Sequence, residues 1–165
     1  MTRLLGIDLG ERRIGLAIAD DDGSAARPLA TIRRGTGLDA DATSIADVVA
    51  RNDVTELVVG LPLNASGTEG PQATMTREWA AAIGSRLSLP VTLRDERLTS
   101  HLAETRLGPM KRGRSGGPPS KTQRDSYRAR VDREAAAIIL QDEVDTRGRL
   151  RSSTSKAQDP QETSP

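Results

Sequence analysis

Residues 4–20, LLGIDLGERRIGLAIAD, contain two short apolar runs on either side of a polar turn at 10–13. Apolar runs of this length, bounded by glycine and charge, are typical of the two strands of a β-hairpin. Asp8 interrupts the first run between Ile7 and Leu9, although an unpaired carboxylate is costly to bury in a strand. We therefore expect Asp8 to face a cation, a metal or an open cleft, unless it simply ends the strand and starts the turn.

Gly6 and Gly10 lie two positions before and after Asp8, and therefore on the same face of the predicted strand. A face without side chains beside the carboxylate lets a ligand approach the backbone closely. The pattern favours an open site at this face, with room for a phosphate group.

The composition narrows the class of protein. A chain of 165 residues fits one domain with one core, and no apolar run is long enough to span a membrane. The chain has no cysteine, and its N-terminus lacks the pattern of a signal peptide, so we expect a cytoplasmic protein. Trp79 and Tyr127 are the only aromatic residues, which argues against an aromatic platform for stacking single-stranded bases.

The formal net charge of +1 hides a basic block between Gly108 and Arg130, in which Asp125 is the one acid. Such a block suits an anionic partner such as nucleic acid, although a solvated loop gives the same pattern. The basic residues of the block are Lys111, Arg112, Arg114, Lys121, Arg124, Arg128 and Arg130.

Hydrophobic spacing beyond residue 20 predicts a third strand, then alternating helices and strands, and two helices at the end. The expected elements are strands at 27–33, 55–61 and 91–94, a helix at 39–51, a helix opening at Gly70-Pro71 that buries Met75, Trp79, Ile83 and Leu87, a helix from Thr99 or Ser100 to Leu107, and a helix at 126–144.

This order predicts an α/β fold: a mixed five-stranded sheet in which three antiparallel strands are followed by βαβ crossovers, with helices on both faces. Ligands of such sheets bind at the carboxyl ends of the strands. We expect one domain over 1–146, followed by a disordered C-terminal tail at 147–165, where apolar residues run out.

Three acids occupy informative places in this scheme: Asp8 in the first strand, Glu96 at the end of the last strand, and Asp132 near the start of the last helix. Glu96 has an alternative role as a surface partner of Arg94 or Arg97. Asp132 also has an alternative role, as a residue that caps or favours the N-terminus of the helix.

Four sequence blocks together resemble the YqgF (RuvX) family, described as Holliday-junction-resolvase-like or as a nuclease that matures pre-16S rRNA. The similarity extends over about 4–141. The blocks are GIDLG at 6–10 with RIGLA at 13–17, VVGLPLN at 58–64 with GT at 67–68, DERLT at 95–99, and Asp132 followed by Ala135-Ala136 and Ile138–Leu140.

The resemblance implies an RNase H-like fold and metal-dependent cleavage of phosphodiester bonds. Carried over by position, Asp8, Glu96 and Asp132 are the catalytic and metal-binding acids, with Mg²⁺ or Mn²⁺ as the cofactor. Because a phosphodiester is already negative, two divalent ions about 3.5–4 Å apart would bridge these acids and the scissile phosphate.

The same reasoning predicts where the nucleic acid makes contact. The loop at 63–70 follows a strand and starts a helix, where backbone amides bind phosphate well. Basic side chains would neutralise the flanking phosphates. The predicted nucleic-acid-binding residues are Asn64, Thr68, Arg97, Lys111, Arg112, Arg114, Lys121 and Arg124.

The sequence also departs from expectation. Several RNase H-like nucleases carry an acid after the strand that follows the first helix, where this chain has residues 62–64, PLN, which predicts weak binding of a second metal. The glycine- and proline-rich insertion at 113–120 is longer than the family pattern. His101 is interpreted as a surface residue of a helix start, with proton transfer as the alternative.

Processing of the 5′ end of pre-16S rRNA is the favoured function, with structured precursor RNA as the partner of a monomer or weak homodimer. A Holliday junction resolvase is an alternative, and it calls for a symmetric dimer. A non-catalytic RNA-binding assembly factor is another. A nucleotide-binding module like those of the actin–hexokinase superfamily needs a second lobe that 165 residues cannot hold.

Overall fold

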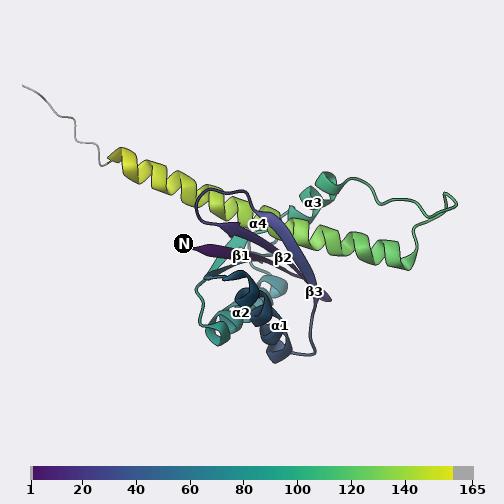
Figure 1. Ribbon diagram of the computed structural model, residues 1–165, viewed down its shortest axis with the longest axis horizontal. Helices are drawn as coiled ribbons and strands as arrows, with labels where there is room; N and C mark the ends of the chain where they lie inside the picture. The colour runs from purple at the N-terminus through teal and green to yellow at the C-terminus, as the bar shows by residue number, and fades with distance from the viewer. Residues whose placement is uncertain (1, 158–165) are drawn as a thin grey trace, which may run out of the picture.

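The computed structural model describes residues 2–157, and Figure 1 shows a twisted sheet with helices on both sides. The described elements are β1 (Arg3–Leu9), β2 (Arg13–Asp20), β3 (Arg27–Arg33), α1 (Leu38–Asn52), β4 (Glu56–Leu61), α2 (Pro71–Leu87), β5 (Val91–Asp95), α3 (Thr99–Leu107) and α4 (Lys121–Ala157). The element order agrees with the prediction, and no helix of the described part has the length and apolar character to cross a membrane.

The five strands form one sheet in the order β3-β2-β1-β4-β5. β1, β2 and β3 pair antiparallel, whereas β4 runs parallel to β1 and β5 runs parallel to β4. The carboxyl ends of β1, β4 and β5 therefore meet at one edge of the sheet. This arrangement confirms the predicted mixed sheet of antiparallel strands followed by βαβ crossovers.

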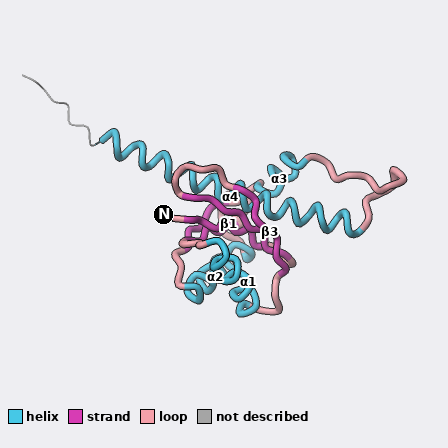
Figure 2. The backbone as a smooth tube through the Cα atoms, in the orientation of Figure 1, coloured by secondary structure: helices cyan, strands magenta, loops and turns pink. Residues whose placement is uncertain are grey.

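One face of the sheet carries the larger hydrophobic core and is covered by α1 and α2 (Figure 2). Alternate residues of the strands point to this face, as expected for a period of two. The fully buried members of the strands are Leu5, Ile7, Ile14, Leu16, Leu57 and Val59, and they pack with Ile45, Trp79 and Ile83 of the helices.

The opposite face is lined by small residues, which lets α4 lie directly on the strands. A Cβ atom on Gly6 would lie 2.7 Å from the Cβ of Leu140 and 2.8 Å from the carbonyl oxygen of Ala136, and one on Gly15 would collide with the carbonyl group of Asp132. The expectation that Gly6 leaves room for a phosphate was therefore wrong, because α4 occupies that space. Gly10 has no such room either, since a Cβ there would lie 2.8 Å from the carbonyl oxygen of Arg13.

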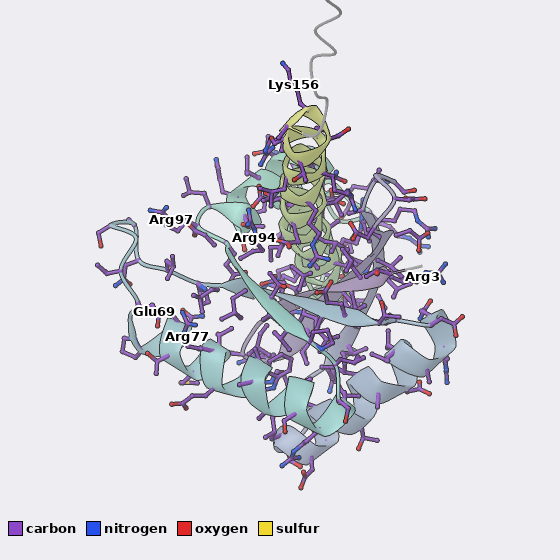
Figure 3. All side chains as sticks on the ribbon, turned by 90° about the vertical axis from the view of Figure 1, so that its left-hand side faces the viewer. Arg3, Glu69, Arg77, Arg94, Arg97 and Lys156 are labelled. Carbon is purple, nitrogen blue, oxygen red and sulfur yellow. The ribbon has the colours of Figure 1, made fainter. Side chains whose placement is uncertain are left out.

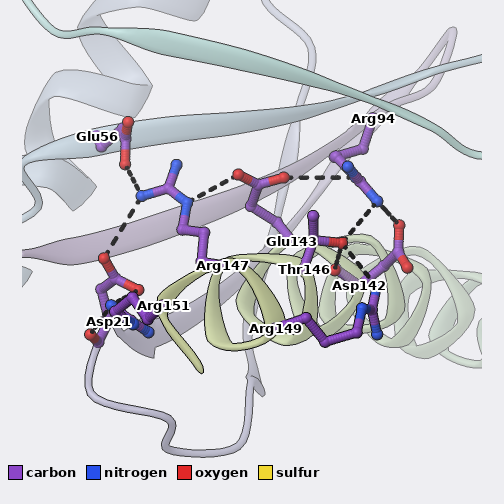
Figure 4. Close-up of polar contacts among 9 residues, drawn as sticks. All are labelled: Asp21, Glu56, Arg94, Asp142, Glu143, Thr146, Arg147, Arg149 and Arg151. Atoms are coloured by element: carbon purple, nitrogen blue, oxygen red, sulfur yellow. Dashed lines mark hydrogen bonds and ion pairs between the residues drawn. The ribbon is translucent and has the colours of Figure 1, made fainter. Parts of the chain in front are cut away.

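The predicted tail is another correction, because α4 continues through residues 147–157 as a helix. Arg147 holds this extension by ion pairs to Glu56 at 2.6 Å and Glu143 at 2.8 Å, and Arg151 pairs with Asp21 at 3.1 Å (Figure 4). These ion pairs join the helical extension to the sheet and its loops, and the polar composition of this segment does not predict them. Residues 158–165, also assigned to the tail, lie outside the described residues.

The first turns of α2 also differ from the prediction. Met75 is 66% exposed, whereas Ala73 and Thr76 are buried. Because an α-helix has 3.6 residues per turn, residues spaced by four are rotated progressively around its axis. Trp79 and Ile83 therefore face the core, whereas Met75, one turn earlier, is rotated toward solvent. Hence the apolar stripe of α2 is narrower than its sequence spacing indicates.

Asp41 of α1 is buried and was not singled out by the sequence pattern. Its carboxylate accepts hydrogen bonds from Trp79 Nε1 at 3.1 Å, Arg34 Nε at 3.1 Å and the backbone N–H of Gly35 at 2.7 Å. One side chain therefore joins α1, α2 and the segment after β3.

We expect Asp41→Ala to lower the free energy of unfolding by about 2–4 kcal/mol, because it leaves a buried indole N–H and a guanidinium without their acceptor. Urea unfolding measures the change. The matched control is Asp47→Ala, which removes an exposed partner of Arg51 from the same helix and should cost less than about 0.5 kcal/mol. Equal losses in the two variants would contradict this role of Asp41.

Candidate active site

Asp8 and Glu96 form a carboxyl pair at the edge of the sheet where the parallel strands end. Asp8 is the penultimate residue of β1, Glu96 directly follows β5, and the two side chains share a hydrogen bond. The backbone N–H of Glu96 donates to the carbonyl of Leu61 at 3.2 Å, which fixes the residue beside β4. The structure therefore brings together two of the three predicted acids.

Gly60 makes room for the Glu96 carboxylate. A Cβ atom at Gly60 would lie 2.5 Å from both Glu96 Oε2 and the Cδ1 of Ile139, so any side chain would displace the carboxylate. The sequence analysis did not assign Gly60 a role. A glycine inside a short apolar strand is the available signal, because it marks a close approach by another group.

The carboxyl pair holds a proton at neutral pH. Burial, together with the charge of Asp8 and the hydrogen bond to it, raises the pKa of Glu96 to about 9. Burial also raises the pKa of Asp8, to about 6, against the hydrogen bond from Glu96 and with the help of the Asp132 charge. Protonated Glu96 thus donates to the Asp8 carboxylate, since two adjacent carboxylates without a cation resist double ionisation.

Asp132 reaches the same face from α4 but has a different partner. Its Oδ2 accepts a hydrogen bond from Arg13 Nε at 2.6 Å, and its backbone carbonyl lies against Gly15, which pairs with Asp8 across the β1–β2 ladder. Because α4 begins at Lys121, Asp132 lies well inside the helix. The alternative role of Asp132 at the helix N-terminus is therefore wrong.

The donor set fits a hard divalent cation in part. Asp8 and Glu96 offer half-buried carboxylate oxygens, the ligands that Mg²⁺ and Mn²⁺ prefer, and their mutual repulsion is what a cation would relieve. Within residues 2–157, however, no three acidic or histidine side chains lie close enough to hold one ion together. The pair fits a metal as it stands, whereas Asp132 is engaged by Arg13.

Three of the predicted nucleic-acid-binding residues gather around the loop that follows β4. Asn64 Nδ2 donates to Thr68 Oγ1 at 3.1 Å across the loop that follows β4. Arg97 Nη1 donates to the carbonyl of Ala65 in that loop at 3.2 Å, and Arg97 pairs with Asp95. Figure 3 shows Arg97 near the start of α3, on the same side of the molecule as Glu69 and Arg77.

The remaining predicted contacts lie away from the acids, on an arm that we define as residues 109–124, between α3 and the first turn of α4 (Figure 1). Arg112 and Arg124 donate only to the backbone carbonyls of Gly116 and Pro119. None of the arm's cations forms an ion pair within the part of the chain described: Lys111, Arg112, Arg114, Lys121 and Arg124. His101 is exposed on α3.

The strand order, the antiparallel β1–β2–β3 unit and the acidic pair at the carboxyl ends of β1 and β5 define an α/β protein with an RNase H-like fold. The family model described as "RuvX: Holliday junction resolvase" matches residues 2–146. The chain therefore belongs to the RuvX (YqgF) family.

Curated relatives agree with this assignment. A protein of Anaeromyxobacter sp. (strain K), named "Putative pre-16S rRNA nuclease", is 46% identical over 145 residues, which cover 88% of this chain and 98% of the relative. A protein of the same name from Chloroflexus aurantiacus (strain ATCC 29366 / DSM 635 / J-10-fl) is 43% identical over 87% of each chain. The solved structure of T. thermophilus RuvC in complex with Holliday junction substrate is similar with a TM-score of 0.49 and 14% identity, over 84% of this chain and 92% of RuvC.

We expect Glu96→Gln to stabilise the metal-free protein by roughly 1–3 kcal/mol at pH 8, because glutamine keeps a donor for Asp8 and removes the buried acid. Glu96 has a folded pKa above its ordinary value of 4.5, so its contribution to stability is present below about pH 4.5 and is lost as the pH rises toward 9. The advantage of the variant should therefore grow from pH 5 to pH 9.

Urea unfolding in EDTA at pH 5, 7 and 9 measures this difference. Glu78→Gln, an exposed position on α2, is the control and should leave the wild-type pH dependence unchanged. Parallel pH profiles for wild type and Glu96→Gln would show that Glu96 titrates normally in the folded state.

Proposed function

We propose that this protein is a metal-dependent nuclease that hydrolyses phosphodiester bonds in precursor 16S rRNA and processes its 5′ end in the cytoplasm. The observation that carries the proposal is the Asp8–Glu96 pair, half-buried and sharing a proton where parallel strands end. The name of the Anaeromyxobacter relative, which this chain matches over nearly its whole length, supports RNA as the substrate.

Asp8 and Glu96 would hold Mg²⁺ or Mn²⁺, and Asp132 would join them on release from Arg13. A bound divalent ion lowers the pKa of its water and neutralises charge on the phosphate. Glu96 would lose its proton to solvent on binding a divalent ion, so binding should release protons. Arg13 holds the Asp132 side chain by its hydrogen bond, and on release its guanidinium would remain at the site as a donor to a phosphate oxygen.

The substrate backbone would lie across the carboxyl edge of the sheet and continue along the arm. Asn64 and Thr68 present polar groups in the loop after β4, beside Glu96. The cations of the arm have no carboxylate partner in the described chain, so they are available to neutralise phosphates. This division leaves cleavage to the carboxyl pair and affinity to the arm.

Cleavage of a Holliday junction is the second candidate, favoured by the description of the matching family model. A resolvase would cut two strands as a symmetric dimer, whereas a monomer or weak homodimer suffices for RNA processing. A non-catalytic assembly factor would bind precursor rRNA without cutting it. The carboxyl pair argues against this third function, because buried acids that repel one another are of no use to a pure RNA binder.

The test compares a precursor 16S rRNA fragment with a four-way DNA junction, using wild type and Asp8→Asn in Mg²⁺, Mn²⁺ and EDTA. We expect metal-dependent cleavage of the RNA alone and a loss of at least about 100-fold in Asp8→Asn, because a ligand of the ion is removed. The control Asp47→Asn, on the far side of α1, should cleave like wild type.

Cleavage of the junction alone, by a dimer, would establish the resolvase. Tight RNA binding without cleavage in any metal would establish the assembly factor. Cleavage by Asp8→Asn at the wild-type rate would place the chemistry elsewhere in the molecule.

A second prediction concerns the arm. We expect the triple variant of Lys111, Arg112 and Arg114 to alanine to bind RNA at least about 10-fold more weakly at physiological salt, because up to three phosphates lose a cationic partner. The slope of log K against log salt should fall by about 2, and the cleavage rate at saturating RNA should stay unchanged. The control is the double variant Arg149→Ala with Lys156→Ala at the other end of α4; equal losses in the two variants would show a non-specific effect of net charge.

A further inference from the structure

A pocket of about 480 Å³ opens beside the carboxyl pair. It lies at the carboxyl ends of β4 and β5, between the loop that follows β4 and the start of α3. Its lining residues are Leu63, Ala65, Asp95, Arg97 and Leu98. Asp95 and Arg97 flank Glu96 in the chain, and Asp95 is near enough for its charge to raise the pKa of Glu96. In the proposed function, a group that fills the pocket would therefore lie near the bond that the carboxyl pair cleaves.

Leu98 is held in the pocket wall at a cost to the fold. It has φ 63°, in the left-handed region, and its side chain is 77% exposed. A leucine there incurs backbone strain without gaining burial. The helix α3 begins at Thr99, one of the two predicted starts, and Leu98 is its N-cap residue without a side-chain cap hydrogen bond. The N–H of Thr99 donates to the carbonyl of Glu96 at 3.1 Å.

The charges of the pocket exclude a phosphate. Asp95 accepts hydrogen bonds from the backbone N–H of Arg97 at 2.9 Å and from its Nε at 2.8 Å, so the guanidinium is already neutralised. The Asp95 carboxylate would repel a second anion at this place. The arm, by contrast, carries cations that have no carboxylate partner among the described residues.

The same groups suit a flat, uncharged ring. Asp95 and the carbonyl of Ala65 fix the Arg97 guanidinium, which offers a planar surface for stacking. Leu63 and Leu98 add apolar walls. An ionised carboxylate has about four acceptor positions, so Asp95 can still accept from an amino group, as acidic side chains do from cytosine N4.

We propose that this pocket binds an unpaired nucleobase of the substrate adjacent to the scissile phosphate, and that it prefers a base with an exocyclic amino group over uracil. The inference rests on the proposed RNA substrate and adds a specificity site to it. Leucine and arginine take the place of the aromatic residues that are nearly absent from this chain.

The test measures binding without cleavage, by fluorescence anisotropy of labelled oligocytidine, oligoadenosine and oligouridine of equal length in EDTA. We expect wild type to bind the cytidine and adenosine oligomers at least about 5-fold more tightly than oligouridine. Leu98→Gly should weaken binding of all three about 5-fold, because the base can no longer stack on the pocket wall. Glycine also relieves the left-handed strain, so this variant should melt at or above the wild-type temperature.

Asp95→Ala should remove the preference for amino-bearing bases. Leu150→Ala, at an exposed leucine on the distal part of α4, is the matched control and should bind like wild type. Unchanged binding by Leu98→Gly, or equal affinities of wild type for the three oligomers, would overturn the pocket proposal even if RNA cleavage is found. Wild type could also show a base preference that depends on Leu98 and Asp95 but cleave no RNA. That result would support the proposed base-binding pocket and overturn only the proposed nuclease activity.

Discussion

The close approach of α4 to β1 and β2 is the constraint on which the candidate active site depends. At Gly6 and Gly15 no side chain separates the helix from the sheet, so α4 lies directly against the strands at these two positions. This contact fixes the distance of Asp132 from β2. Asp132 lies over Gly15, the residue that pairs with Asp8 in the neighbouring strand. A larger residue at Gly15 would push α4 away from the sheet at Asp132 itself, the residue that pairs with Arg13.

Placing Asp8 and Glu96 together costs folding free energy, which other interactions of the fold must offset. Glu96 occupies the space beside Gly60, and the two acids lie together at neutral pH because one of them keeps its proton. Burial alone would favour apolar side chains at both positions. The opposite face of the sheet carries the larger core with α1 and α2, so the strands remain anchored while their α4 face holds polar groups.

Much of this architecture could be predicted from the sequence, because alternation and short apolar runs are local signals. The extent of α4 could not, since its last turns depend on Arg147 contacting Glu56 across 91 positions of the chain. The prediction for Gly6 was wrong for a related reason: a glycine beside an acid makes room for a ligand or for a helix, and the tertiary fold decides which. Asp41 has no local signal at all, because its partners Trp79 and Arg34 are brought to it by packing.

The cations next to the acids differ from those on the arm in whether they are paired with a carboxylate. Arg97, nearest to Glu96 in the chain, is neutralised by Asp95, and Arg13 is neutralised by Asp132. The cations of the arm have no carboxylate partner in the described chain, and neither do Arg12, Arg128 and Arg133. In the proposed function, the arm attracts the polyanion, and the groups beside the carboxyl pair orient it without binding its phosphates strongly. Affinity and chemistry are thus assigned to separate elements, so loss of one should leave the other measurable.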